Sequence, residues 1–180
     1  AAGRLKTLAE AATALLLGCG WGKSPDLAWL LEDLLLSCRR PMVLDADALN
    51  LLSERRETGI NAGSRRIDIL KQAKAPLILT PHPGEMARLT GLTVAEVQRN
   101  RVECARKFAA EYGVTLVLKG AGTVVADPAG RVKVNLTGNP GMATGGSGDM
   151  LAGMILSLLA QGLPADRKST RQNSSHIRRS

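Results

Sequence analysis

Aromatic residues are scarce in this sequence of 180 residues, which contains one Phe, one Tyr and two Trp. Proteins that bind single-stranded nucleic acids stack the bases on aromatic side chains, so this scarcity argues against such a surface. Long apolar runs are also missing, because none reaches the roughly 18 residues that a membrane-spanning helix needs. The first residues show no signal-peptide pattern. We therefore expect neither a nucleic acid nor a membrane as a partner.

Cysteine is sparse as well. Cys19, Cys38 and Cys104 are odd in number and widely spaced, and no Cys-x-x-Cys pair occurs. This pattern favours free or buried thiols in a reducing compartment over disulfides or a zinc site. A cytoplasmic location is therefore expected.

Hydrophobic residues make up 44% of the sequence and are mostly aliphatic, which is enough for one full-sized core. We expect one domain over residues 1–165. Half of the net charge of +8 lies in residues 166–180, a segment with almost no apolar residue and no periodicity. This tail is expected to be disordered and foreign to the domain, and a nucleic-acid-binding arm is the alternative.

Glycine is concentrated in residues 137–149, directly before the apolar segment 150–159. A glycine-dense loop that leads into a helix N-terminus places unpaired N–H groups and the positive end of a helix dipole around one small volume, where anions bind. Asp149 is the only carboxylate in this loop. It is either a reactive group or simply a helix N-cap. The spacing fits neither a Walker A loop nor a dinucleotide-binding fingerprint.

Two carboxylates and an amide follow the apolar strand predicted at residues 42–44: Asp45, Asp47 and Asn50. The carboxyl ends of strands are where open α/β sheets place their ligands, and such side chains could hold a hydrated Mg²⁺. The alternative is that Asp45 or Asp47 caps a helix over residues 48–53.

His82 stands between Pro81 and Pro83, after a strand predicted at residues 76–79. Two prolines stiffen the backbone and fix where the ring points, which suggests a positioned side chain. The alternative is that this segment only shapes a turn into a helix over residues 84–89.

A further loop with chemical character follows the strand predicted at residues 114–118 and runs through Lys119, Gly120, Ala121, Gly122 and Thr123. Lys and Thr separated by glycines suit contacts with phosphate or ribose. The alternative is a tight hairpin turn with a solvated Lys, because residues 123–126 and 131–135 read as returning strands.

The remaining pattern is that of an α/β protein. A strand at residues 14–17 ends in alternating glycines, Gly18, Gly20 and Gly22. Helices are predicted from Ser24 at an N-cap onward, over residues 67–73, and over residues 93–112 as the longest helix, with a capping box of Thr93 and Glu96. Four strands thus end in loops rich in Gly, Asp, His or Lys, which favours a mostly parallel sheet with helices on both faces and a ligand crevice at the strand C-termini.

Five segments occur together in the order seen in one family: residues 18–22, 43–50, 79–85, 118–123 and 139–149. The chain resembles the ADP-dependent NAD(P)H-hydrate dehydratases. The resemblance implies a three-layer ribokinase-like fold and repair of the (6S) hydrated cofactors NADHX and NADPHX. ADP, or ATP in some relatives, would phosphorylate the C6 hydroxyl together with Mg²⁺, and loss of phosphate would restore NADH or NADPH. The family also implies a homo-oligomer at full length and a further N-terminal portion, so we expect an N-terminally truncated fragment.

The resemblance also implies roles for individual residues. Asp149 would be the catalytic base and would contact the hydrated cofactor together with Gly20, Gly22 and His82. The nucleotide would be bound by Lys119, Gly120, Ala121, Gly122, Thr123 and Gly148. The pocket would be supported by Asp45, Asp47, Asn50, Asn139, Gly145 and Gly146. No direct metal ligand is assigned.

Two other functions share these features. A ribokinase-like kinase of a small alcohol, such as a vitamin precursor, would use the same glycine loop and Asp149 but would release a phosphorylated product. A non-catalytic nucleotide-binding module would need only the loops.

Overall fold

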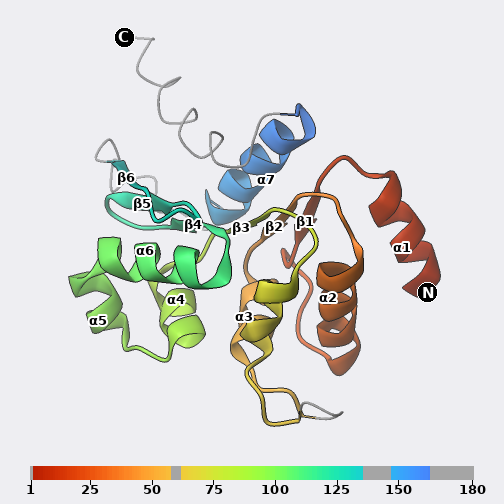
Figure 1. Ribbon diagram of the computed structural model, residues 1–180, viewed down its shortest axis with the longest axis horizontal. Coiled ribbons are helices and arrows are strands. Elements are labelled where there is room, and N and C mark those ends of the chain that lie inside the picture. The colour runs from red at the N-terminus through yellow and green to blue at the C-terminus, as the bar shows by residue number, and fades with distance from the viewer. Residues whose placement is uncertain (1, 58–61, 136–146, 163–180) are drawn as a thin grey trace.

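A computed structural model describes residues 2–57, 62–135 and 147–162 of the chain (Figure 1). Its centre is a sheet whose six strands follow one another in chain order. The strands are β1 (Leu15–Leu17), β2 (Met42–Leu44), β3 (Leu77–Leu79), β4 (Thr115–Leu118), β5 (Thr123–Ala126) and β6 (Val132–Asn135). Strands β1 to β4 are parallel, and β5 and β6 are added antiparallel. The predicted, mostly parallel α/β sheet is confirmed.

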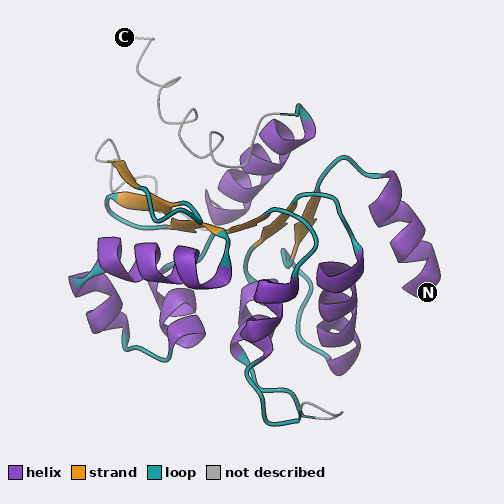
Figure 2. Ribbon diagram, in the orientation of Figure 1, coloured by secondary structure: helices purple, strands orange, loops and turns teal. Residues whose placement is uncertain are grey.

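The helices that connect the parallel strands lie together on one side of the sheet (Figure 2). They are α2 (Pro25–Ser37), α3 (Asp47–Ser53), the 3₁₀ helix η1 (Arg66–Gln72), α4 (Pro83–Thr90), α5 (Val94–Arg99) and α6 (Arg101–Tyr112). Right-handed crossovers between strands added in one direction put every connecting helix on the same face. The opposite side carries α7 (Ser147–Ala160), and α1 (Ala2–Ala11) precedes β1.

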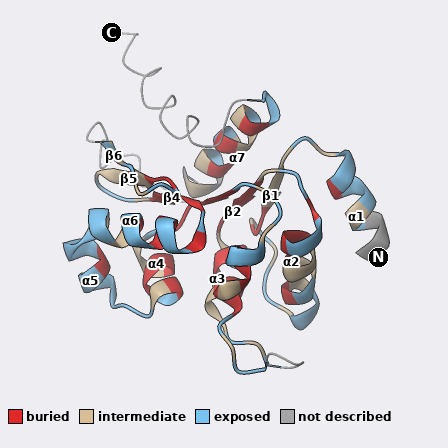
Figure 3. Ribbon diagram, viewed as in Figure 1, coloured by how far each residue is buried: buried red, intermediate tan, exposed pale blue. Residues whose placement is uncertain are grey.

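Side chains alternate between the two faces of the sheet, as the pleat requires. Val43, Ile78 and Val117 point toward α7 and pack with its Ala152 and Ile155. Their neighbours along each strand belong to the larger core under α2 to α6. The strands are therefore buried on both faces in the middle of the sheet (Figure 3), which explains their continuous apolar sequences.

Local sequence signals set several helix ends. Ser24 caps α2, because its hydroxyl accepts a hydrogen bond from the N–H of Leu27 at 3.2 Å, and Pro25 occupies the first turn. The capping box of Thr93 and Glu96 is confirmed at the start of α5. The single helix predicted over residues 93–112 is wrong, because the chain breaks at Asn100 into α5 and α6. Helix α5 packs against α4, whereas α6 packs against β4 and β5, so the two halves follow different neighbours.

Candidate functional site

The loops that follow the four parallel strands lie side by side at one edge of the sheet. Main-chain hydrogen bonds join each loop to the next. The N–H of Asp45 donates to Leu17 at 3.1 Å, and the N–H of Thr80 donates to Leu44 at 3.1 Å. The N–H of Lys119 donates to Pro81 at 2.8 Å. The structure thus brings together four of the loops that carry chemical side chains, at the edge where parallel sheets bind ligands.

Asp45 and Lys119 form the central contact of this edge. The Lys119 ammonium lies 2.8 Å from Asp45 Oδ1, and the two side chains are 18% and 2% exposed, respectively. The same Asp45 oxygen accepts the N–H of Ala46 at 2.9 Å. The interpretation of Lys119 as a solvated turn residue is therefore wrong, although residues 119–122 do connect the predicted hairpin of β4 and β5.

Helix α7 begins beside this ion pair. A Cβ on Gly148 would lie 3.2 Å from Lys119 Nζ, so the second residue of the helix comes within contact distance of the ammonium. The first turn of a helix presents unpaired N–H groups and a partial positive charge. An ammonium next to these amides forms a site for an anion such as phosphate. Asp149 follows in the same turn of α7.

Asp47 connects the first two loops. Its Oδ2 accepts the N–H of Gly22 at 2.8 Å, and its Oδ1 accepts the Asn50 amide at 3.4 Å. Helix α3 has Ala46 at its N-cap position and no side-chain cap, so the alternative in which Asp45 or Asp47 caps this helix is wrong. Both carboxylates instead hold groups from other loops, which explains why two of them follow one strand.

These contacts also test the expected magnesium site. The carboxylate of Asp45 is occupied by an ammonium, and that of Asp47 by two N–H donors. Within the described ranges, no three His, Cys, Asp or Glu side chains gather closely enough to hold a metal ion. The carboxylates of Asp45 and Asp47 therefore suit the nitrogen donors that they already bind better than they suit direct ligation of Mg²⁺.

His82 is the N-cap of α4. Its Nδ1 accepts the N–H groups of Gly84 and Glu85 at 3.0 and 3.3 Å, and the buried Glu85 carboxylate accepts the N–H of His82 at 2.8 Å. The alternative in which the segment shapes the turn into a helix is thus confirmed. The ring is 51% exposed, so it stays accessible from solvent at this edge of the sheet. Its contact with a substrate remains a prediction.

Other predicted residues divide into two groups. Gly20, Gly22, Gly120 and Ala121 are exposed in the loops of this edge. Asn139, Gly145, Gly146 and the tail 166–180 lie outside the described residues, as does the side chain of Asp149. Their expected roles remain predictions.

One residue of this edge was missed at the sequence level. Arg101, at the start of α6, donates hydrogen bonds to main-chain carbonyls of the loop after β4. No motif contains Arg101, and it lies 17 residues before Leu118 in the sequence. The sequence offered no signal for it, because the single helix expected over residues 93–112 places Arg101 in a helix interior, and only the break at Asn100 puts it at a helix start.

The fold and this edge define the class of the protein. The mostly parallel sheet extended by an antiparallel hairpin matches the fold of a ribokinase-like superfamily protein of Enterococcus faecalis, with a TM-score of 0.71 at 27% identity, over 96% of this chain and 55% of that one. None of the described helices is long and apolar enough to cross a membrane.

The chain belongs to the NAD(P)H-hydrate dehydratase family, whose model matches residues 2–178. It is 48% identical over 153 residues to an ADP-dependent (S)-NAD(P)H-hydrate dehydratase of Neisseria meningitidis, covering 84% of this chain and 48% of the relative. It is 48% identical over 159 residues to a bifunctional NAD(P)H-hydrate repair enzyme of Moorella thermoacetica, covering 88% of this chain and 28% of the relative. The chain thus spans half or less of the length of these relatives.

A solved structure supports the same assignment. The ADP/ATP-dependent NAD(P)H-hydrate dehydratase of Bacillus subtilis, co-crystallised with ATP and Mg²⁺, matches with a TM-score of 0.71 at 34% identity. The match covers 90% of this chain and 55% of that one. The ribokinase-like fold predicted from the sequence is confirmed.

Proposed function

We propose that this chain carries the nucleotide site and the catalytic loop of an ADP-dependent dehydratase that converts hydrated NADH and NADPH back to the intact cofactors. The Neisseria relative bears that name, and the chain shares 48% of its residues over the aligned region. The observation that carries the proposal is the meeting of Asp45, Lys119 and Gly148 at one point. A polyphosphate would bind there between an anchored cation and the amides that open α7.

The proposed reaction has two steps, phosphorylation of the hydrate and elimination of phosphate. In the first step, an oxygen–phosphorus bond forms between the C6 hydroxyl of the hydrate and the terminal phosphoryl group of ADP, and AMP leaves. Asp149 takes the hydroxyl proton. In the second step, the C6–O bond breaks and phosphate leaves with its bonding electrons, while C5 loses a proton, so that the C5–C6 double bond of the dihydronicotinamide ring is restored. Positioning and charge stabilisation account for most catalysis of phosphoryl transfer, which is what the loops of this edge provide.

Each loop has a part in this scheme. Residues 119–123 bind the nucleotide, with Gly148 at its phosphates, and Asp45 holds the Lys119 ammonium in place. Gly20, Gly22 and His82 contact the hydrated nicotinamide from the neighbouring loops. Mg²⁺ bound to the phosphates of the nucleotide would shield the charge of the phosphoryl group. We also propose a cytoplasmic location and, for the full-length protein, a homo-oligomeric assembly.

The test is regeneration of NADH. Purified chain is incubated with NADHX, ADP and Mg²⁺, and the return of NADH absorbance is followed, with the Neisseria relative as a positive control. We expect regeneration that requires ADP, with AMP and phosphate as the other products. Asp149→Asn is expected to lower turnover by at least about 10³-fold while ADP affinity stays within a factor of about two, because the carboxylate acts on the substrate proton and not on the nucleotide.

The same assay separates the two reaction types. A stable phosphorylated product without NADH would assign the chain to the small-alcohol kinases. ADP binding without either product would leave a nucleotide-binding module. Unchanged turnover in Asp149→Asn would remove this residue from the mechanism.

A further inference from the structure

Arg101 makes an unusual set of contacts with the loop between β4 and β5. One terminal nitrogen, Nη2, donates to the carbonyl of Leu118 at 3.0 Å and to those of Lys119 and Gly122 at 3.2 Å each. The other, Nη1, donates to the Gln98 side chain at 2.8 Å. A single guanidinium therefore gathers three carbonyls of the five-residue segment 118–122.

The electrostatic setting of Arg101 is unfavourable without this loop. The residue opens α6, where the helix dipole repels a cation. Burial lowers the pKa of its guanidinium, and no carboxylate of the described chain forms a salt bridge with it. Its Nε is buried without a hydrogen-bond partner among the described residues. The three carbonyl oxygens of the loop, together with the Gln98 side-chain oxygen, thus stabilise the charge at this position.

The shape of the loop matches the guanidinium. Gly120 has a φ of +136°, and a Cβ at this position would lie 2.9 Å from Arg101 Nη1. A side chain would therefore strain the backbone and displace the guanidinium at the same time. The glycine that was expected to admit a ligand also admits Arg101.

These contacts fix the main chain of Lys119 from both sides. Its N–H donates to Pro81 at 2.8 Å, and its carbonyl accepts from Arg101 at 3.2 Å. With both groups held, the direction of the Cα–Cβ bond is fixed. From this fixed start, the side chain extends so that its ammonium lies beside Asp45 and the start of α7. The contact of Arg101 thus reaches the anion site through the backbone.

We propose that Arg101 is a positioning residue of the nucleotide site, which holds residues 118–122 in the conformation that binds ADP. The inference rests on the proposed function only for the identity of the nucleotide. The structural part, that Arg101 orders this loop, stands on the contacts themselves.

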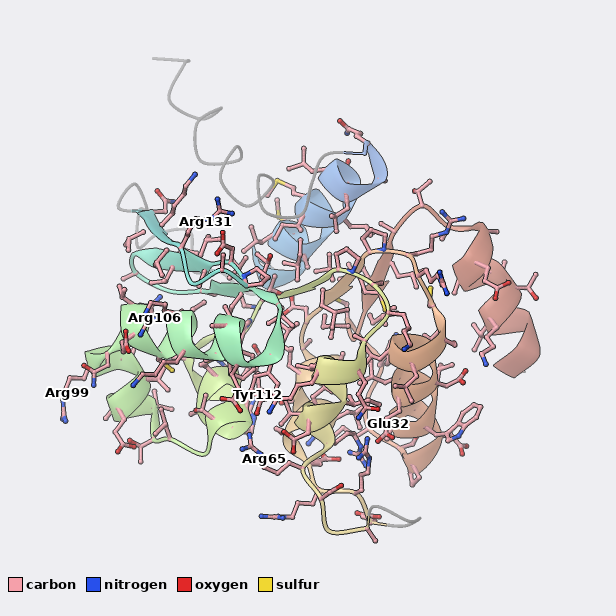
Figure 4. The ribbon with its side chains drawn as sticks, viewed as in Figure 1. Glu32, Arg65, Arg99, Arg106, Tyr112 and Arg131 are labelled. Carbon is pink, nitrogen blue, oxygen red and sulfur yellow. The ribbon has the colours of Figure 1, made fainter. Side chains whose placement is uncertain are left out.

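The experiment compares three variants. Arg101→Ala removes the three hydrogen bonds from the guanidinium to the loop, and Arg101→Lys keeps a charge but loses the planar fork. Arg106→Ala is the matched control, because Arg106 lies on the same helix and pairs with the exposed Glu103 (Figure 4). ADP binding is measured by calorimetry, and amide hydrogen exchange is measured for residues 119–125.

We expect Arg101→Ala to weaken ADP binding roughly tenfold, Arg101→Lys to recover only part of the loss, and Arg106→Ala to bind as the parent chain does. In turnover, KM for ADP rises while kcat stays within about twofold. In Arg101→Ala, amide hydrogen exchange is expected to accelerate in residues 119–125 and to stay unchanged in β1 to β3. Unchanged ADP affinity, full recovery by Lys, or acceleration spread over the whole sheet would overturn the inference.

The two proposals fail separately. If the parent chain itself does not bind ADP, the proposed function fails, and the exchange measurements still decide whether Arg101 orders the loop. If the parent chain binds ADP and the Arg101 variants bind it equally well, the inference fails and the proposed function stands.

Discussion

At the scale of single residues, the site depends on close approaches that leave no room for side chains. Gly18 is the tightest of these. It has a φ of +113°, and a Cβ there would lie 1.9 Å from the carbonyl oxygen of Asp45 and 2.6 Å from the nitrogen of Ala48. Both neighbours are main-chain atoms, so they cannot rotate away. The loop after β1 is thereby pressed against the loop that carries the ion pair with Lys119.

Gly18→Ala is accordingly expected to destabilise the fold by about 3 kcal/mol or more, because it combines backbone strain with a clash against fixed atoms. Gly63→Ala is the matched control, since Gly63 also has a positive φ, +81°, but no atom of the described residues lies within 4 Å of its Cβ position. That change should cost only about 1 kcal/mol. Urea unfolding measures both free energies, and equal costs would contradict the close approach at Gly18.

At the scale of elements, helix ends are set by pairs of side chains that satisfy one another. At the start of α5, the Glu96 carboxylate accepts the N–H of Thr93 at 2.8 Å and its hydroxyl at 2.7 Å. These two bonds lower the pKa of Glu96, the main-chain bond being the larger cause. Because the folded-state pKa lies below the ordinary value, the carboxylate stabilises the fold above that value. The contribution is lost as the pH falls through the folded pKa.

Thr93→Ala should therefore raise the pKa of Glu96 toward its ordinary value and flatten the fall in stability on the acid side. The change removes both bonds of the Thr93 hydroxyl, the one that it donates to the Glu96 carboxylate and the one that it accepts from the Glu96 N–H. The bond from the Thr93 N–H to the carboxylate stays and should keep part of the shift in the pKa. Carboxyl-carbon NMR titration measures the pKa, and thermal unfolding between roughly pH 3 and 5 measures the slope. Thr90→Ala is the control, because the Thr90 hydroxyl donates to the main chain of Met86 and Ala87 and not to Glu96. An unmoved Glu96 pKa in Thr93→Ala would be evidence against the capping box.

At the scale of the whole molecule, the two faces of the sheet are covered unequally. The six connecting helices lie on one side, and within the described residues α7 covers the other face. The same helix supplies the N-terminal amides next to Lys119. Packing of this face and the anion site therefore depend on one element.

Ile155→Ala tests this dependence. Ile155 is fully buried against the sheet, so its truncation should cost about 3 kcal/mol of stability and also weaken ADP binding by loosening the start of α7. Met154→Ala is the neighbouring control, since Met154 is 41% exposed and its loss should change the stability by less than about 0.5 kcal/mol. Chemical unfolding and ADP titration measure the two effects. If Ile155→Ala is clearly destabilised but binds ADP as tightly as the parent chain, the anion site does not depend on the packing of α7 against the sheet.

How far the sequence predicts this protein depends on the distance over which each signal acts. The strands appear within one residue of their predicted positions, because short apolar runs between glycines and prolines are local signals. The break at Asn100 was not predictable in this way, because the helical pattern continues through it and only the packing of α5 and α6 on different neighbours divides it.

The candidate site shows the same division. The glycine loops and their polar side chains were visible in the sequence, but their pairings were not. Asp45 and Lys119 are 74 residues apart and lie after β2 and β4, which are two strand spacings, or about 10 Å, from each other. Only a long side chain with the right direction spans that gap. The contact of Arg101 depends in the same way on how α6 lies across the hairpin.

The ion pair of Asp45 and Lys119 has a consequence for any anion that binds beside α7. A free lysine side chain loses up to about 2 kcal/mol of rotamer entropy when it is immobilised. Here that ordering is completed when the chain folds, because the carboxylate already fixes the ammonium. An ammonium has three N–H donors, so the ones not directed at Asp45 can turn to an incoming phosphate. The site is therefore preorganised, and the affinity for an anion is not reduced by the entropy of arranging its main cation.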